Sequence, residues 1–255
     1  MGEFFKKNRP ALLYAASLIF WLAVWQLAGA LVNEQIFIAS PLSVFERLLE
    51  LMRTRDFYDS VLRTMGLICL GFALAAVLGS ALGWLGCKSR AAKTLLSPIM
   101  GVIKATPVAS FIILAFILVG SRRLSALIAF LMVLPVFYSN VLTALESLPA
   151  RRFEAADVFG MLPRDRFRFI YLPGLAPYFL SASGIGLGMA WKSGVAAEVI
   201  GLAAGSIGRR LYEAKLNLDT AGLFAYTLVV VLLSLALEKL LRLLLERLES
   251  RLLKS

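Results

Sequence analysis

The residues whose types and spacing indicate a specific role lie between Glu154 and Pro173. This segment is rich in charged residues, whereas most of the chain is apolar. The local chemistry is that of two short helices joined by a sharp turn. Ala155 and Ala156 are good helix formers and are small enough to let another surface approach closely. Gly160 can take the left-handed conformation that ends a helix. Pro163 suits the first turn of the next helix.

The spacing of this segment resembles the EAA signature of the membrane subunits of ATP-binding-cassette (ABC) importers. Glu154-Ala155-Ala156 is followed by three residues, Gly160, nine residues and Ile170-Tyr171-Leu172-Pro173. In that family the segment, here residues 149–173, is a cytoplasmic loop that docks on the ATPase subunit. The resemblance implies that the coupling residues are Glu154, Ala155, Ala156, Gly160, Ile170, Leu172 and Pro173. The alternative is a solvated loop whose arginines only fix orientation.

The composition indicates an all-α integral membrane protein. Of the 255 residues, 60% are hydrophobic and 17% are charged. The mean hydropathy is +0.81, and a soluble domain is closer to half apolar and a quarter charged. The net charge of +11 could suggest a nucleic-acid partner. The basic residues, however, fall mainly between apolar runs, so membrane topology explains them better and we expect no nucleic acid.

No residue set predicts catalysis, a metal site or a bound cofactor. The chain has no histidine and two cysteines, and Cys69 and Cys87 lie in or at the end of apolar runs, which favours packing over a disulfide. Gly86-Cys87-Lys88-Ser89 lacks the Gly-Lys adjacency of a phosphate-binding loop. We therefore expect that ATP and Mg²⁺ bind only to a partner subunit and that this chain is not itself an enzyme.

Apolar runs predict six membrane-spanning helices within one permease domain over residues 1–255. Their approximate limits are 11–32, 65–86, 95–119, 124–145, 175–200 and 221–245. The first run follows a basic start like that of a secretory signal, but it is too long for a signal core, so we expect it to be retained. Gly79 and Gly83 form a small-residue pair that lets helices pack closely.

Before the second span, Ser40-Pro41 looks like an N-cap followed by proline at the first helical position. The residues after it alternate at helical spacing between apolar and charged side chains. This pattern predicts a short amphipathic helix outside the bilayer or along its surface, or a plain packing helix.

Charge bias predicts the orientation. With the charged helical extension after Leu237 counted as cytoplasmic, sixteen Lys or Arg residues fall in the segments that would face the cytoplasm, against nine in the outer segments. This places residues 149–173 and both termini in the cytoplasm of a multi-pass protein of the cell inner membrane.

Ionisable residues inside spans are costly, by roughly 2.5–3.5 kcal/mol on insertion scales, so they are candidates for the substrate pathway. Lys192 and Glu198 lie in the fifth span. They are separated by about 9 Å along the axis and roughly 120° around it, so they cannot pair on one helical face. Lys104 lies nearer a span end, where it can reach the interface. The alternative for each is a structural role.

The wider sequence resembles permeases of the nitrate/sulfonate/taurine group, through Ser40-Pro41, the fourth-span proline and the stretch from Trp191 to Glu198. The resemblance implies the type I importer permease (MetI-like) fold. It also implies a partner permease, expected to form a homodimer, two ATPase subunits and an extracytoplasmic binding protein. We expect a small anion such as a sulfonate as the substrate, although related permeases carry neutral or cationic pyrimidine compounds.

Two other classes share some of these features. A secondary transporter would also have bent spans and buried charges, but would usually show inverted repeats and would not need the Glu154 signature. A membrane-embedded enzyme would need a catalytic constellation, which the sequence does not show.

Overall fold

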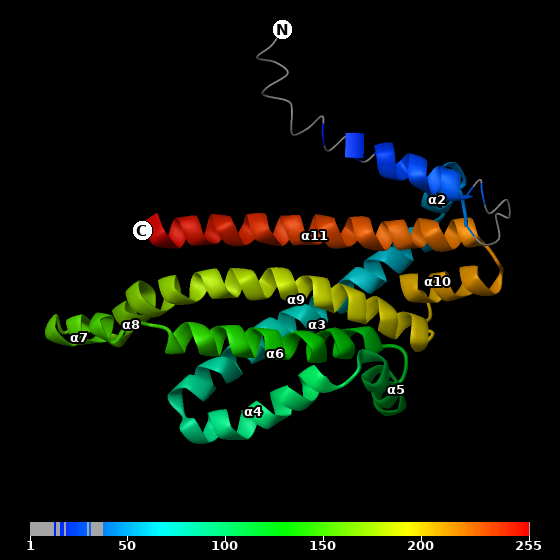
Figure 1. Cartoon of the computed structure of the whole chain (residues 1–255). Helices are drawn as coiled ribbons and strands as arrows, with labels where there is room; N and C mark the ends of the chain where they lie inside the picture. The colour runs from blue at the N-terminus through cyan, green and yellow to red at the C-terminus, as the bar shows by residue number, and fades with distance from the viewer. Residues whose placement is uncertain (1–12, 14–15, 18, 30, 32–37, 255) are drawn as a thin grey trace, which may run out of the picture. The chain divides into compact units, whose positions relative to one another are not determined.

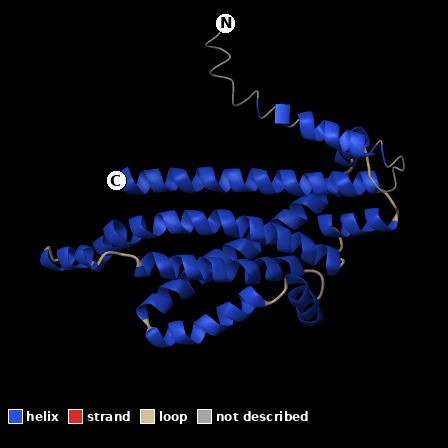
Figure 2. Cartoon of the chain, in the orientation of Figure 1, coloured by secondary structure: helices blue, strands red, loops and turns tan. Residues whose placement is uncertain are grey.

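The computed structural model of the chain describes residues 13, 16–17, 19–29, 31 and 38–254. The described part is helical and contains no strand (Figure 2). After a short apolar helix, Ile19–Gly29, the elements are α2 (Pro41–Met52), α3 (Arg55–Lys88), α4 (Arg90–Ala105), α5 (Val108–Val119), α6 (Leu124–Glu146), α7 (Ala150–Val158), α8 (Pro163–Arg166), the π-helix η1 (Phe167–Tyr171), α9 (Leu172–Ile200), α10 (Ile207–Leu216) and α11 (Thr220–Lys254) (Figure 1). The all-α class is confirmed.

Four helical stretches are long and apolar enough to cross a membrane. They are Arg55–Lys88, Leu124–Glu146, Pro163–Ile200 and Thr220–Leu244. The bent pair α4 and α5 would make a fifth if it counts as one span. The helix Ile19–Gly29 lies within the first predicted span, 11–32, whose remaining residues lie largely outside the described part. The count of six therefore stays a prediction.

The predicted third span, 95–119, is interrupted rather than continuous. α4 ends at Ala105 and α5 begins at Val108, and the two helices meet at 106°. Thr106 is extended, with φ −75° and ψ 129°, because the ring of Pro107 disfavours a helical conformation in the residue before it. Pro107 also has no N–H to continue the helix. The sequence pattern located the apolar residues but not the break.

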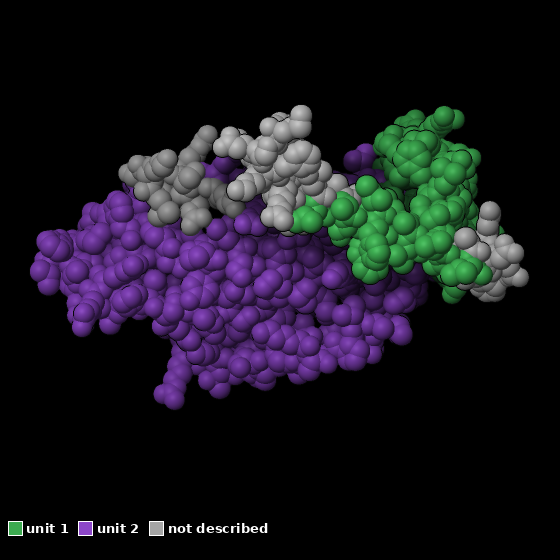
Figure 3. Space-filling view, turned by 45° about the horizontal axis from the view of Figure 1, so that its top comes forward, with its two compact units in different colours: residues 1–58, 210–229 green, residues 59–209, 230–255 purple. Residues whose placement is uncertain are grey.

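The chain divides into two compact units, residues 1–58 with 210–229 and residues 59–209 with 230–255 (Figure 3). Helices α3, α10 and α11 each contribute residues to both units. The chain therefore passes from one unit to the other within these helices and not through a separate linker. The single permease domain over residues 1–255 stays a prediction.

The first unit is organised around α2. The Ser40 hydroxyl accepts a hydrogen bond from Ser43 N at 3.2 Å, and Pro41 occupies the first turn, so the predicted cap is confirmed. Val44 is buried with Ala39 and Ala225. The apolar side chains that remain exposed are Leu42, Phe45, Leu49 and Met52, as the amphipathic pattern predicts.

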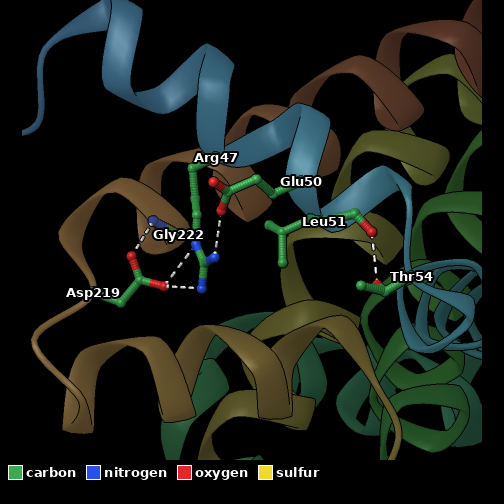
Figure 4. Close-up of polar contacts among 6 residues, drawn as sticks. All are labelled: Arg47, Glu50, Leu51, Thr54, Asp219 and Gly222. Carbon is green, nitrogen blue, oxygen red and sulfur yellow. Dashed lines mark hydrogen bonds and ion pairs between the residues drawn. The ribbon is translucent and has the colours of Figure 1, made fainter.

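An arginine ties α2 to the start of α11 within this unit (Figure 4). The Arg47 guanidinium donates to Asp219 Oδ2 through Nη2, at 2.7 Å, and Nε, at 3.0 Å, and to Glu50 Oε2 at 2.7 Å. These bonds, with Glu50 contributing most, raise the pKa of Arg47. Asp219 Oδ1 accepts from Gly222 N at 2.8 Å, which caps α11. One carboxylate thus serves both the ion pair and the helix end.

The second unit is built on α6, the most deeply buried of its helices. α6 packs along α9 (Figure 1), and a cluster of buried residues from α5, α6 and α9 forms a core: Ile112, Ala115, Leu124, Ile128, Met132 and Ala197. Trp191 of α9 is buried and donates its indole N–H to the carbonyl of Val230 at 2.8 Å, which links α9 to α11.

α3 packs on α6 through glycines. A Cβ at Gly79 would lie 2.8 Å from the Leu134 carbonyl oxygen, and one at Gly83 would lie 2.8 Å from the Tyr138 carbonyl oxygen. The predicted small-residue pair is therefore used inside the chain, where it lets two spans approach to backbone distance. The same face is not free for a second copy.

This packing predicts that Gly79→Ala destabilises the protein by about 1–3 kcal/mol, because the added methyl group meets backbone that cannot move aside easily. Gly66→Ala is the matched control on the same helix, since nothing lies within 4 Å of a Cβ there. Thermal unfolding in detergent should show a lower midpoint for Gly79→Ala and an equal or higher one for Gly66→Ala. Equal midpoints for the two variants would contradict the close α3–α6 contact.

Candidate functional site

The segment 149–173, which we call the coupling loop, forms a helix, a tight turn and a second helix. α7 ends in a left-handed glycine, Gly160, with φ +60°. Met161 N donates to the Ala156 carbonyl at 2.9 Å, and Gly160 N donates to the Asp157 carbonyl at 3.1 Å. This pair of bonds is the Schellman motif, which satisfies the last carbonyl groups of a helix. The predicted turn at Gly160 is confirmed.

The second helix is held against the first by an arginine. Pro163 lies in the first turn of α8, as predicted. Arg166 of α8 pairs with Asp157 of α7 at 2.7 Å and donates from Nε to the Met161 carbonyl at 3.0 Å. The guanidinium therefore bridges α7 and the turn. The loop has its own internal polar framework, so it can hold one shape outside the bilayer.

The coupling loop continues without a break into a span. Helix η1 is a π-helix in which Leu172 N bonds to the Phe167 carbonyl, five residues back, and α9 begins at Leu172. Pro173 favours the wide turn, because its ring nitrogen cannot donate to the Phe169 carbonyl four residues before it. The resulting helical stretch from Pro163 to Ile200 has 38 residues. No flexible connector therefore separates the loop from α9.

The surface of the coupling loop is apolar at its tip and charged around it. Val158 and Phe159 are 84% and 81% exposed. Three further apolar side chains are exposed nearby in sequence, Leu162, Phe167 and Phe169. Glu154 is also exposed, and no hydrogen bond or ion pair holds its carboxylate among the described residues. Exposed apolar groups with a charged surround are typical of a protein interface.

The other signature residues divide between surface and interior. Ala155 is exposed beside Glu154, whereas Ala156 and Ile170 are 1% and 5% exposed. Leu172 and Pro173 are partly buried in the first turn of α9. One part of the signature is thus presented outward, and the other holds the loop on the spans.

Residues 75–254 match the family described as the binding-protein-dependent transport system inner membrane component. The chain belongs to this family. A protein named "Probable ABC transporter permease protein" from Brucella melitensis biotype 1 is 29% identical over 225 residues, which cover 86% of this chain and 88% of that protein. The taurine transport system permease protein of Escherichia coli K12 is 27% identical over 246 residues, covering 92% and 89%.

A solved structure of the MetNI methionine ABC transporter, in an inward-facing conformation, has the same fold. The TM-score is 0.62 at 17% identity, and the match covers 77% of this chain and 96% of the solved chain. The protein is therefore a multi-pass ABC importer permease. Its family is that of membrane subunits, which sets aside the secondary transporter and the membrane-embedded enzyme.

Within the permease, Glu198 lies at a buried polar junction. Its Oε2 accepts from Thr64 Oγ1 at 2.8 Å and from Gly208 N at 3.2 Å, and Ile207 N donates to Thr64 Oγ1 at 3.0 Å. Glu198 and Thr64 are both fully buried. A carboxylate from α9 and a hydroxyl from α3 thus satisfy the first amides of α10, which a helix cannot bond internally.

The surroundings of the Glu198 side chain indicate a structural contact with α10. The second oxygen, Oε1, is buried and has no hydrogen-bond partner in the described part of the chain. A Cβ at Gly208 would lie 2.7 Å from Val199 N, so only glycine lets α10 begin so close to α9. In this conformation Glu198 anchors α10. Its part in the substrate pathway stays a prediction.

The two predicted pathway lysines lie on open surfaces. Lys192 is exposed on α9 between the buried residues Trp191 and Ser193. Within the described residues no hydrogen bond or ion pair involves its ammonium group. Lys104 donates to Ser139 Oγ of α6 at 3.4 Å. No bond joins Lys192, Lys104 and Glu198 to one another in the described residues, so the structure does not gather them into one site.

Sequence reasoning missed several residues that the structure brings to the coupling loop. Trp84 of α3 packs on Tyr171 of η1, and Tyr171 packs on Phe153 of α7. The available signal was the spacing of Trp84 and Lys88, four residues apart at the end of an apolar run. Among the described residues no cluster of three His, Cys, Asp or Glu could hold a metal ion.

Proposed function

We propose that this permease forms the translocation pathway of an ABC importer and that its coupling loop docks on the ATPase subunit. One observation carries the proposal: the signature residues lie in a rigid helix–turn–helix with an exposed apolar tip that continues into α9. A connector would need neither the exposed Phe159 nor the Schellman turn. ATP and Mg²⁺ would bind to the partner ATPase.

The mechanism follows from the continuity of the helices. ATP binding closes the ATPase subunits, and a docked α7 moves with them. Because η1 joins α9 without a loop, the motion reaches the spans directly. Glu154 forms a charge pair at the docking surface, and Gly160 sets the angle between α7 and α8. Substrate arrives from an extracytoplasmic binding protein on the other side of the membrane.

Orientation and assembly complete the proposal. The coupling loop and both termini face the cytoplasm of a cell inner membrane, because that side holds most of the Lys and Arg residues. Two permease copies, as a homodimer, line the pathway above two ATPase subunits. Gly184 and Gly188 of α9 support this arrangement, since nothing lies within 4 Å of a Cβ at either residue and the small surface is open.

The proposed substrate is a small anion such as a sulfonate. Lys192 supports it, because an exposed ammonium group on a span with no partner in the described residues is a cation that a passing anion can approach. The similarity to the taurine permease points the same way. A neutral or cationic pyrimidine compound is the alternative, and it would have no use for the Lys192 charge.

The docking proposal predicts that Gly160→Val abolishes coupled ATP hydrolysis, because a β-branched residue is strained at a φ of +60°. Gly160→Asn is the control, since asparagine adopts this conformation more readily. Both variants should insert normally, as Gly160 lies outside the spans. Binding of the co-expressed ATPase subunit and substrate-stimulated hydrolysis are the measurements. Glu154→Lys reverses a charge at the docking surface and should weaken binding of the ATPase subunit. If Gly160→Val and Glu154→Lys each keep full binding and hydrolysis, the loop is only a connector.

The substrate proposal predicts that Lys192→Ala reduces taurine uptake into proteoliposomes by roughly tenfold or more, the equivalent of losing about 1.4 kcal/mol of interaction. Lys192→Arg keeps the charge and should retain most of the uptake. Assembly with the ATPase should be unchanged in both variants, because the side chain is exposed. If the alanine variant takes up taurine normally, Lys192 does not attract the substrate. If the wild type takes up neither taurine, an alkanesulfonate nor nitrate, the choice of a small anion as substrate is wrong.

A further inference from the structure

A stack of aromatic side chains joins the coupling loop to the end of α3. The ring centroids of Tyr171 and Trp84 are 4.9 Å apart, and those of Tyr171 and Phe153 are 5.4 Å apart. The ring centroids of Phe167 and Trp84 are 6.0 Å apart. These distances are in the range in which aromatic pairs attract beyond simple burial. Three elements, α3, α7 and η1, therefore meet through ring contacts.

A lysine closes the stack. The Lys88 ammonium lies 5.7 Å from the Trp84 ring centroid and 5.5 Å from that of Tyr171, and it donates to the Tyr171 hydroxyl at 3.5 Å. A cation at this distance over a ring face is attracted to it. Because Trp84 and Lys88 are one helical turn apart on α3, both hold Tyr171 from the same side.

A cavity of about 250 Å³ opens beside the stack, lined by Trp84, Cys87, Lys88, Leu145, Phe153 and Tyr171. Since empty space adjoins the rings, loss of one ring leaves few neighbours to take its place. Tyr171 is also the last residue of the π-helix, and such wide turns are frequent at functional positions.

We propose that Trp84, Tyr171 and Phe153, with Lys88, form a rigid joint that passes the movement of α7 to the last turns of α3. The joint gives the coupling loop a second route into the spans, beside its direct continuation into α9. The four residues are positioning residues: they act on the spans and contact neither substrate nor nucleotide. This inference rests on the proposed docking of the loop on an ATPase subunit.

The test is a distance between two spin labels, one on each side of the joint. Arg151→Cys labels α7 and Leu85→Cys labels α3, and both side chains are exposed. Cys69 and Cys87 are replaced by serine, and the labelled chain is diluted into unlabelled permease so that only distances within one chain are seen. The complex with its ATPase subunit is compared without nucleotide and after trapping with ATP and vanadate.

A rigid joint predicts one narrow distance distribution that stays the same in both states. Trp84→Leu and Tyr171→Leu should broaden it and make it shift on trapping, and Trp84→Phe should restore it. The substrate-stimulated hydrolysis of the leucine variants should fall by roughly 2- to 10-fold, the range expected for one aromatic contact. The matched control is Phe72→Leu, which removes a ring from a pair with Phe137 at 5.6 Å that lies elsewhere on α3.

The outcomes separate the two claims. If the ATPase subunit does not bind the wild-type permease through the loop, the proposed function fails and the joint has no motion to pass on. If the subunit binds but the wild-type distance shifts on trapping, the joint is not rigid. A narrow, unshifted distribution in both leucine variants, or the same broadening in Phe72→Leu, would show that these rings do not link α7 to α3. The wild-type measurement decides even if a leucine variant fails to assemble.

Discussion

Charged side chains and unpaired backbone groups are costly inside a bilayer, and this constraint explains much of how the permease is arranged. The segment with arginines and aspartates around Glu154 has to fold outside the lipid, where water can reach its charges. It nevertheless keeps one shape, because the Schellman bonds at Gly160 and the Asp157–Arg166 pair satisfy its polar groups internally. Inside the second unit the same constraint acts on Glu198, whose carboxylate is placed among a hydroxyl and the free amides of α10.

A shaped loop is useful only if the spans beneath it are firmly packed. α6 supplies that support, since it lies against α9 along its length and against the glycines of α3 at backbone distance. The loop begins just after α6 and ends where α9 begins. Its ends are therefore fixed to two helices of one core rather than to flexible connections.

The sequence predicted features that depend on a single residue's backbone preference. Gly160 follows the helix-forming Ala155 and Ala156 and precedes Pro163, a context in which glycine commonly ends a helix in a left-handed turn. Ser40 before Pro41 is similarly typical of a helix start, so both features were predictable. The break before Pro107 was harder, because proline is common in membrane helices and apolarity alone does not distinguish a kink from a 106° bend. The surroundings of Glu198 depend on Thr64, 134 residues away in the sequence, and no pattern of neighbouring residues predicts such a contact. The π-helix and the stack around Tyr171 depend on tertiary packing in the same way.

Docking of the permease depends on the exposed tip of the coupling loop being the surface that meets the ATPase, and site-specific photo-cross-linking tests this most directly. A photoreactive phenylalanine analogue at Phe159 should cross-link to the ATPase subunit in the assembled complex, since this side chain is 81% exposed at the tip. The same analogue at Ile113, which is 56% exposed on α5 within the bent pair, should give no such product. Cross-linking to the ATPase from Ile113 but not from Phe159 would contradict the account.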